Sequence, residues 1–145
     1  MEDKYLYKAK RADNGEWVQG VPFEIEGKMV ILIKDNENLL RVHYLDENVW
    51  TAEIYAIEVD SSTICQYTGL KDKNGKSIWE NDVVKGKYYA EYKPHRHIGQ
   101  VKYIYEAYKV VGVKQYTGYH ARLDGSYEVI GNIFDNKELV ENKEN

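Results

Sequence analysis

The stretch from Tyr88 to His97 gathers the residue types that bind single-stranded nucleic acids. Aromatic rings stack on exposed bases, and cationic side chains meet the phosphates. The candidate nucleic-acid or partner surface comprises seven residues: Tyr88, Tyr89, Tyr92, Lys93, His95, Arg96 and His97. The alternative is an exposed strand end and loop in a protein that carries 14 tyrosines but only 2 phenylalanines. The sequence leaves both interpretations open.

Three other groups of side chains offer weaker chemistry. His95 and His97 share one face of an extended segment and could ligate a metal, but no third ligand is evident in the sequence. Glu80 and Asp82 could act as paired carboxylates in acid–base chemistry, although carboxylates in turns commonly accept backbone N–H bonds. Cys65 has no obvious activating neighbour. We therefore expect no catalytic residue, no metal and no cofactor, and a protein that is not an enzyme.

The composition bounds the class of protein. A chain of 145 residues is long enough for one domain or two very small ones. The formal net charge of −4 weighs against bulk electrostatic binding to nucleic acid or anionic lipid, although a local basic patch would overcome it. A single cysteine excludes an internal disulfide, and the longest apolar run, Met29–Ile33, is too short to span a bilayer. We expect a cytoplasmic protein with no membrane partner.

The elements that must position these side chains are mostly strands. Short runs of β-branched and aromatic residues alternate with Asn-Gly, Asp-Gly and acidic turn signals. Trp50–Val59 also fits a helical spacing, but we favour a strand there. A short helix is expected at Lys137–Glu144, capped by Asn136 or by Asp135 with Glu138. The expected strands are Lys4–Arg11, Glu16–Gln19, Met29–Lys34, Leu39–Leu45, Trp50–Val59, Val83–Tyr92, Ile98–Tyr108, Val110–Tyr116, Ala121–Leu123 and Tyr127–Phe134.

The segment from Gln66 to Lys85, QYTGLKDKNGKSIWENDVVK, is dominated by turn chemistry. Asn74-Gly75 favours a tight turn, because glycine adopts positive φ without steric cost. The neighbouring Asp72 and lysines are expected to solvate this turn. Asp82, which precedes a pair of valines, is expected to accept backbone N–H bonds at the start of a long strand. The segment therefore predicts backbone geometry rather than an active site.

Three blocks of this sequence resemble the YopX family of phage and prophage proteins. They are QYTGLKDKNGK with the acidic turn and paired aliphatics after it, the closing YEVIGNIFDNKELVE, and the opening YLYKAKRADNGEWVQG. Residues 28–58 and 86–126 match only loosely. Asn81, Lys137 and Cys65 depart from the family's usual Gly, Pro and Gly, and Asn81 is the next best residue for positive φ.

The resemblance implies a mainly β protein of phage or prophage origin, located in the cytoplasm of a bacterial host. It implies an SH3-like small β-barrel in the C-terminal part. The polar loop at Asp60–Thr63 is the best internal boundary, so we expect an N-terminal β-hairpin or sheet region at 1–60, either independent or packed on the barrel, and the barrel with its short C-terminal helix at 61–145. The resemblance supplies no catalytic residue, because the family is largely uncharacterised.

Two functions remain as hypotheses. The first is a non-enzymatic module that binds a protein or a single-stranded nucleic acid, for which the stretch from Tyr88 to His97 favours nucleic acid and the acidic net charge favours protein. The alternative is a structural phage protein that self-assembles into a homo-oligomer through exposed strands. The sequence identifies neither the partner nor the oligomeric state.

Overall fold

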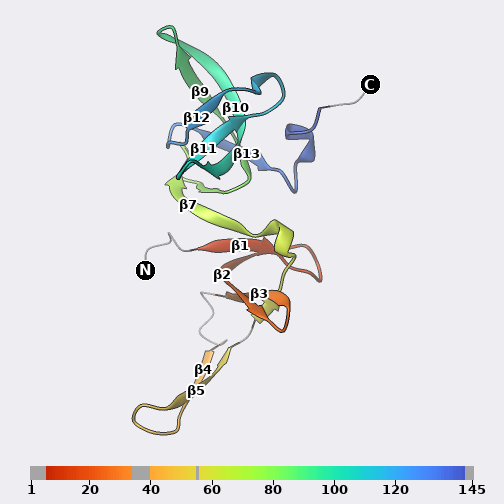
Figure 1. The fold of residues 1–145 in the computed structure, drawn as a ribbon, viewed down its shortest axis with the longest axis vertical. Helices are drawn as coiled ribbons and strands as arrows, with labels where there is room; N and C mark the ends of the chain where they lie inside the picture. Colours follow the sequence, from red (N-terminus) through yellow and green to blue (C-terminus); the bar gives the residue numbers. More distant parts are fainter. Residues whose placement is uncertain (1–5, 34–39, 55, 143–145) are drawn as a thin grey trace. The chain divides into compact units, whose positions relative to one another are not determined.

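The computed structural model describes residues 6–33, 40–54 and 56–142 (Figure 1). The prediction of a mainly β protein is confirmed, since strands dominate and the described helical segments are short 3₁₀ turns. Residues 4, 5, 34, 39 and 55 of the predicted strands, and 143 and 144 of the predicted helix, lie outside the described residues. No helix in the described ranges is long and apolar enough to cross a membrane. The chain divides into two compact units, Lys4–Gln66 and Tyr67–Asn145.

The N-terminal unit is built on an antiparallel sheet with the strand order β6-β3-β2-β1-β7. Its buried centre comprises Ala9, Ile31 and Val59. The expected Asn-Gly turn is present, and Gly15 has a φ of 73°. The strand bounds are β1 Tyr7–Lys10, β2 Trp17–Ile25, β3 Lys28–Ile33, β6 Ala56–Glu58 and β7 Cys65–Lys71.

A separate two-stranded hairpin pairs β4, Leu40–Tyr44, with β5, Trp50–Ile54. The strand interpretation of Trp50–Val59 is therefore confirmed for the described residues, which include β5 and β6. The expected boundary at residues 60 and 61 lies in the loop before β7, where a 3₁₀ turn spans Ser61–Thr63. β7 itself continues from the first unit into the second.

The C-terminal unit contains a five-stranded antiparallel sheet with the order β12-β11-β10-β9-β13. Beside it, the second half of β7 pairs with β8. Its core gathers side chains from across these strands: Ile78, Val84, Val101, Val110, Leu123 and Tyr127. The bounds are β8 Ser77–Trp79, β9 Asp82–Ala90, β10 Lys93–Ile104, β11 Ala107–Gly112, β12 His120–Arg122 and β13 Glu128–Asn132.

Two finer expectations for this unit are not confirmed. The hydrogen-bonded order ends at β12 on one side and at β13 on the other, so the sheet does not close into the predicted SH3-like barrel. The predicted C-terminal helix is a single 3₁₀ turn, Lys137–Leu139. Asn136 does not cap it, because its side-chain oxygen accepts the backbone N–H of Asn132 at 3.2 Å instead.

The signature segment has the predicted turn geometry. Gly75 and Asn81 have φ values of 82° and 71°, and Asp82 accepts the backbone N–H of Trp79 at 2.8 Å. The expectation for Asp72 is wrong: it is buried rather than solvating, and its carboxylate accepts backbone N–H bonds from Asn74, Lys76 and Val129, each at 2.9 Å. Burial raises the pKa of Asp72, but these donors outweigh it and hold the pKa below its usual range.

Candidate functional site on the β9–β10 hairpin

The stretch predicted as a surface is the end of a β-hairpin. β9 and β10 pair from Val83 opposite Gln100 to Ala90 opposite Lys93. β13 pairs with β9 only as far as Lys85, and β11 pairs with β10 only from Gly99 onward. The outer part of the hairpin is therefore a two-stranded ribbon that continues past the rest of the sheet (Figure 1).

A loop is expected at the end of this stretch, but the structure has a tight hairpin turn at Glu91 and Tyr92 that leads directly into β10. Both residues have positive φ, 53° and 64°, and a second such turn at Tyr105 and Glu106, 50° and 64°, separates β10 from β11. The predicted strands Ile98–Tyr108 and Val110–Tyr116 are accordingly wrong in their bounds, since β10 begins at Lys93 and β11 ends at Gly112. Neither turn contains the Gly or Asn that usually signals this conformation.

The structure brings the seven predicted residues into one hairpin but divides them between its two faces. Side chains alternate along each strand, and directly paired residues share a face. Four of the predicted residues lie on what we call the inner face, which continues the core: Tyr88, Lys93, His95 and His97. Tyr89 and Arg96 lie on the outer face, and Tyr92 lies in the turn, fully exposed.

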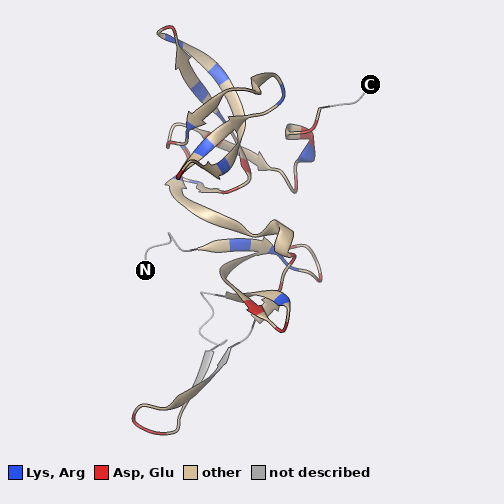
Figure 2. Ribbon diagram, in the orientation of Figure 1, with Lys and Arg blue, Asp and Glu red and all other residues tan. Residues whose placement is uncertain are grey.

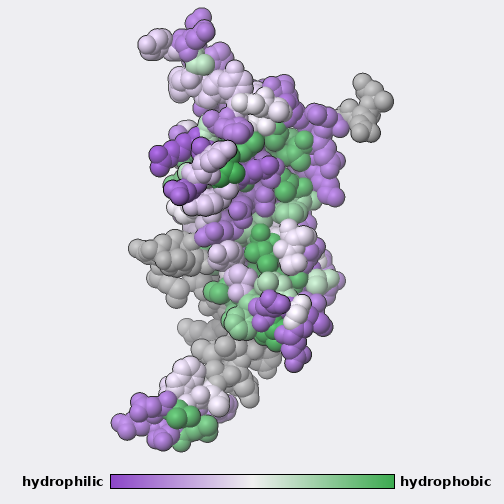
Figure 3. Space-filling model, in the orientation of Figure 1, coloured by the Kyte–Doolittle hydropathy of each residue, from purple (hydrophilic) through white to green (hydrophobic). Residues whose placement is uncertain are grey.

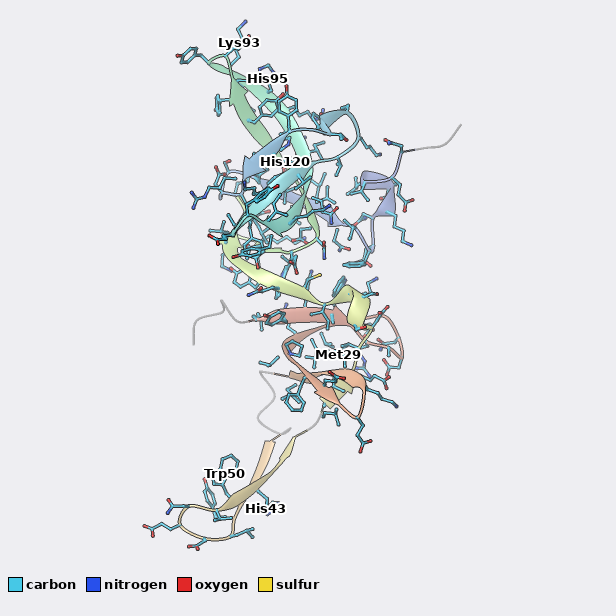
Figure 4. The ribbon with its side chains drawn as sticks, viewed as in Figure 1. Met29, His43, Trp50, Lys93, His95 and His120 are labelled. Carbon is cyan, nitrogen blue, oxygen red and sulfur yellow. The ribbon has the colours of Figure 1, made fainter. Side chains whose placement is uncertain are left out.

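An aromatic stack covers part of the inner face. The ring of Tyr88 lies between those of His95 and Tyr119, with centroid distances of 5.1 Å and 4.4 Å. Tyr119 belongs to the loop between β11 and β12, so this stack fastens that loop to the hairpin. Figure 4 shows Lys93 and His95 at the outer end of the ribbon.

His97 is fully buried beneath this stack. Its Nδ1 lies 3.0 Å from the hydroxyl of Tyr127, and its Nε2 lies 3.3 Å from the carbonyl oxygen of Tyr119. A neutral ring satisfies both contacts, because Nδ1 accepts from the hydroxyl while Nε2–H donates to the carbonyl. Burial lowers the pKa of His97, against the opposing effect of the Tyr119 carbonyl, and burial raises the pKa of Tyr127 to about 12.

Gly86 allows Tyr127 to lie against the hairpin. A Cβ atom at this position would be 2.5 Å from the Tyr127 ring, closer than real Cβ contacts allow. Gly86 is paired with His97 across the two strands, and Tyr127 contacts both residues. Sequence reasoning missed Gly86, because only the tertiary position of Tyr127 explains it.

The outer face presents cations and an aromatic ring. Lys85, Lys87 and Tyr89 alternate with inward residues along β9, and Arg96 is paired with Lys87. All four side chains are exposed, with Tyr89 at 74%. Among the described residues, none of these three cations forms an ion pair. The predicted surface begins at Tyr88 and so leaves out Lys85 and Lys87, although their alternation with Tyr89 is visible in the sequence.

An open hollow lies beside the outer face of β9. Its volume is about 590 Å³. Lys73 at its margin lies 3.4 Å from Glu128, measured from Nζ to Oε2. The turn at Asn74-Gly75 and the segment that leads into β13 contribute the rest of the lining. The lining residues are Lys73, Lys85, Gly86, Lys87, Tyr89, Asp124, Ser126 and Glu128.

The charge of the chain is unevenly distributed. Residues 67–145 hold 13 Lys and Arg against 11 Asp and Glu, a formal charge of +2, whereas residues 1–66 hold 7 against 13, a charge of −6. From Lys85 to His97 there are four cations and one acidic residue, Glu91 (Figure 2). The acidic net charge that weighed against nucleic acid therefore arises from the N-terminal unit.

Three of the other candidate residues make contacts within the fold. Asp82 is buried and accepts from the Trp79 backbone, and both ring nitrogens of His97 already have contacts. Cys65 is buried, with its Sγ 3.2 Å from the Thr63 carbonyl oxygen. In the part of the chain that the structure describes, no three His, Cys, Asp or Glu side chains form a metal-binding group. Figure 4 shows His120 and His43 on separate elements, β12 and β4.

The fold and this hairpin define a mainly β protein that carries a basic, aromatic ribbon. The chain belongs to the YopX protein family, whose model matches residues 6–141. The structure is similar to the crystal structure of protein EF1440 from Enterococcus faecalis, at 23% identity and a TM-score of 0.53, covering 93% of this chain and 96% of that one. At this identity the likeness shows a shared fold alone. No curated protein matches the sequence.

Proposed function

We propose that this YopX-family protein is a non-enzymatic binding module, encoded by a phage or prophage, that binds single-stranded nucleic acid in the bacterial cytoplasm. The outer face of the β9–β10 hairpin would carry the binding. Phosphates would lie against Lys85, Lys87 and Arg96, and a base would stack on Tyr89.

One observation carries this proposal: three cations and an exposed tyrosine share one face of the β9–β10 hairpin. Three described cations elsewhere on the chain form ion pairs, and the shortest joins Arg11 to Asp13 at 2.7 Å. Those of the outer face keep their charge for a ligand. A ribbon also suits a single strand, because its length along β9 lets successive phosphates meet successive side chains.

The test compares two cross-strand pairs of cations. Lys87→Ala with Arg96→Ala removes two charges from the outer face, and Lys102→Ala with Lys109→Ala removes two from another pair on the same sheet. Binding to single-stranded DNA and RNA is measured by fluorescence anisotropy over a range of salt concentrations. The slope of log K against log salt is negative, and we expect its magnitude to fall by about 1.4 in the first double variant. Each phosphate contact on a single strand contributes about 0.7 to that magnitude.

The control pair should leave both affinity and slope nearly unchanged. Equal losses in the two double variants would mean that binding follows net charge and not this face. The absence of binding by the wild-type protein at low salt would remove the proposal.

A second candidate, self-assembly, is favoured by exposed apolar side chains on the β4–β5 hairpin. Tyr44 and Trp50 are paired across it and are 79% and 59% exposed. Leu45 and Val49 are exposed beside them, and Figure 3 shows hydrophobic surface at the end of this hairpin. Exposed apolar clusters of this kind mark association surfaces. Light scattering at several concentrations tests this candidate, which a strict monomer would exclude.

A further inference from the structure

We propose that the hollow beside β9 selects guanine from the bound strand. This inference rests on the proposed function and names the base that the site prefers. It is carried by the pairing of a carboxylate with an ammonium group at the margin of a hollow that already contains cations and an exposed aromatic ring.

The hollow has room for a nucleotide. Its volume of about 590 Å³ lies within the range of sites that hold small ligands. Lys85 and Lys87 lie along its wall on β9, where they can meet phosphates, and the exposed ring of Tyr89 offers a stacking surface. These groups bind any nucleotide, so they carry affinity rather than selectivity.

Glu128 supplies the selective contact. Its side chain is 37% exposed, so a ligand can reach the carboxylate. Oε2 lies 3.4 Å from the ammonium of Lys73, and Oε1 lies 3.4 Å from the amide nitrogen of Asn74. These contacts are long, so each oxygen keeps capacity for a further hydrogen bond.

Guanine matches this pair of groups better than any other standard base. Its Watson–Crick edge presents two adjacent N–H donors, N1–H and N2–H, followed by the acceptor O6. The two donors fit the two oxygens of one carboxylate, and O6 then faces the ammonium of Lys73. Cytosine and adenine offer a single amino group, and thymine and uracil offer a single ring N–H.

The experiment uses the full chain and three labelled oligonucleotides in anisotropy titrations at low salt. One is oligothymidylate, the second carries isolated guanines within it so that no quadruplex forms, and the third carries inosine at the same places. Inosine lacks only the N2 amino group, so it removes one of the two donors. We expect the guanine oligonucleotide to bind about tenfold more tightly than the other two, which lies within the range of discrimination that a good bidentate contact provides.

Glu128→Gln is the matched variant, because it keeps the shape and replaces one acceptor oxygen with a donor. It should lose the guanine preference, measured within the variant as the ratio of its affinities for the guanine oligonucleotide and oligothymidylate. Binding that is equal for all three oligonucleotides, or a preference that survives in the variant, would overturn guanine selection and leave the proposed function standing. No binding to any oligonucleotide would overturn both. The inosine comparison needs no variant, so it decides the matter even if Glu128→Gln folds poorly.

Discussion

The two faces of the β9–β10 hairpin use the same residue types for different purposes. On the inner face, Tyr88 and His97 are held by stacking and hydrogen bonds that fasten a loop to the ribbon. On the outer face, Tyr89 and Arg96 point away from the core and remain exposed. Tyr88 and Tyr89 are adjacent in the sequence, yet one serves stability and the other is available to a ligand. The alternation of a strand, rather than the residue type, separates the two roles.

The largest expected effect is on stability, at His97. Truncation by His97→Ala leaves the Tyr127 hydroxyl and the Tyr119 carbonyl without this buried partner and opens a cavity. We expect the free energy of unfolding to fall by about 3 kcal/mol, as for other buried hydrogen-bonded side chains. Urea denaturation followed by tyrosine and tryptophan fluorescence measures it.

His95→Ala is the matched control on the same face. Its ring is exposed and stacks on Tyr88 from outside, so its loss should cost about 0.5 kcal/mol. Equal losses for the two histidines would contradict the assignment of His97 as the buried support of the hairpin.

The next effect concerns binding, at Tyr89. Removing its ring by Tyr89→Ala should weaken single-strand binding by about 2 kcal/mol, the usual contribution of one stacked base, with little change in stability. Tyr105→Ala is the control, because Tyr105 is 85% exposed in the turn between β10 and β11. If both variants bind as the wild type does, the outer face does not stack bases.

The sequence predicts the backbone conformation correctly where the type of a single residue determines it. Gly75 and Asn81 adopt the positive φ that their types favour, and Asp82 accepts the expected backbone N–H. Most strands follow for a similar reason, since runs of β-branched and aromatic residues between turn signals fit a pleated sheet. These features depend on residues close together in the chain, so the sequence alone predicts them.

The rest depends on contacts between distant residues. The turns at Glu91-Tyr92 and Tyr105-Glu106 adopt positive φ without a favourable residue, because the pairing of β9, β10 and β11 leaves only two residues to connect each pair of strands. Asp72 is buried because its carboxylate accepts from Val129, 57 positions away. The alternation of Tyr89 with Lys85 and Lys87 indicates which of the two adjacent tyrosines faces solvent, but only the tertiary structure shows that Tyr88 stacks on Tyr119.

The smallest expected effect is a dependence of the free energy of unfolding on pH, which comes from the buried His97 on the inner face. Burial lowers the pKa of His97 below its ordinary value of 6.5, so the unfolded chain takes up this proton at a higher pH than the folded protein does. The neutral ring contributes its full stability above pH 6.5, and that contribution is lost as the pH falls through the lowered pKa. Each unit by which the pKa is lowered corresponds to about 1.4 kcal/mol.

The neighbours of His97 allow this dependence to be assigned. The rings around it are those of Tyr88, Tyr116 and Tyr127, and His120 is the nearby charge that opposes protonation of His97. We expect His97→Gln to be less stable at pH 7 but to lose less stability between pH 7 and pH 5 than the wild type does. His95→Gln is the matched control on the same face and should keep the wild-type dependence, because the His95 ring is exposed rather than buried. Urea denaturation between pH 5 and pH 7 measures how the free energy of unfolding depends on pH. If this dependence is the same in His97→Gln as in the wild type, burial of His97 does not exclude the proton, and the two faces do not differ in this respect.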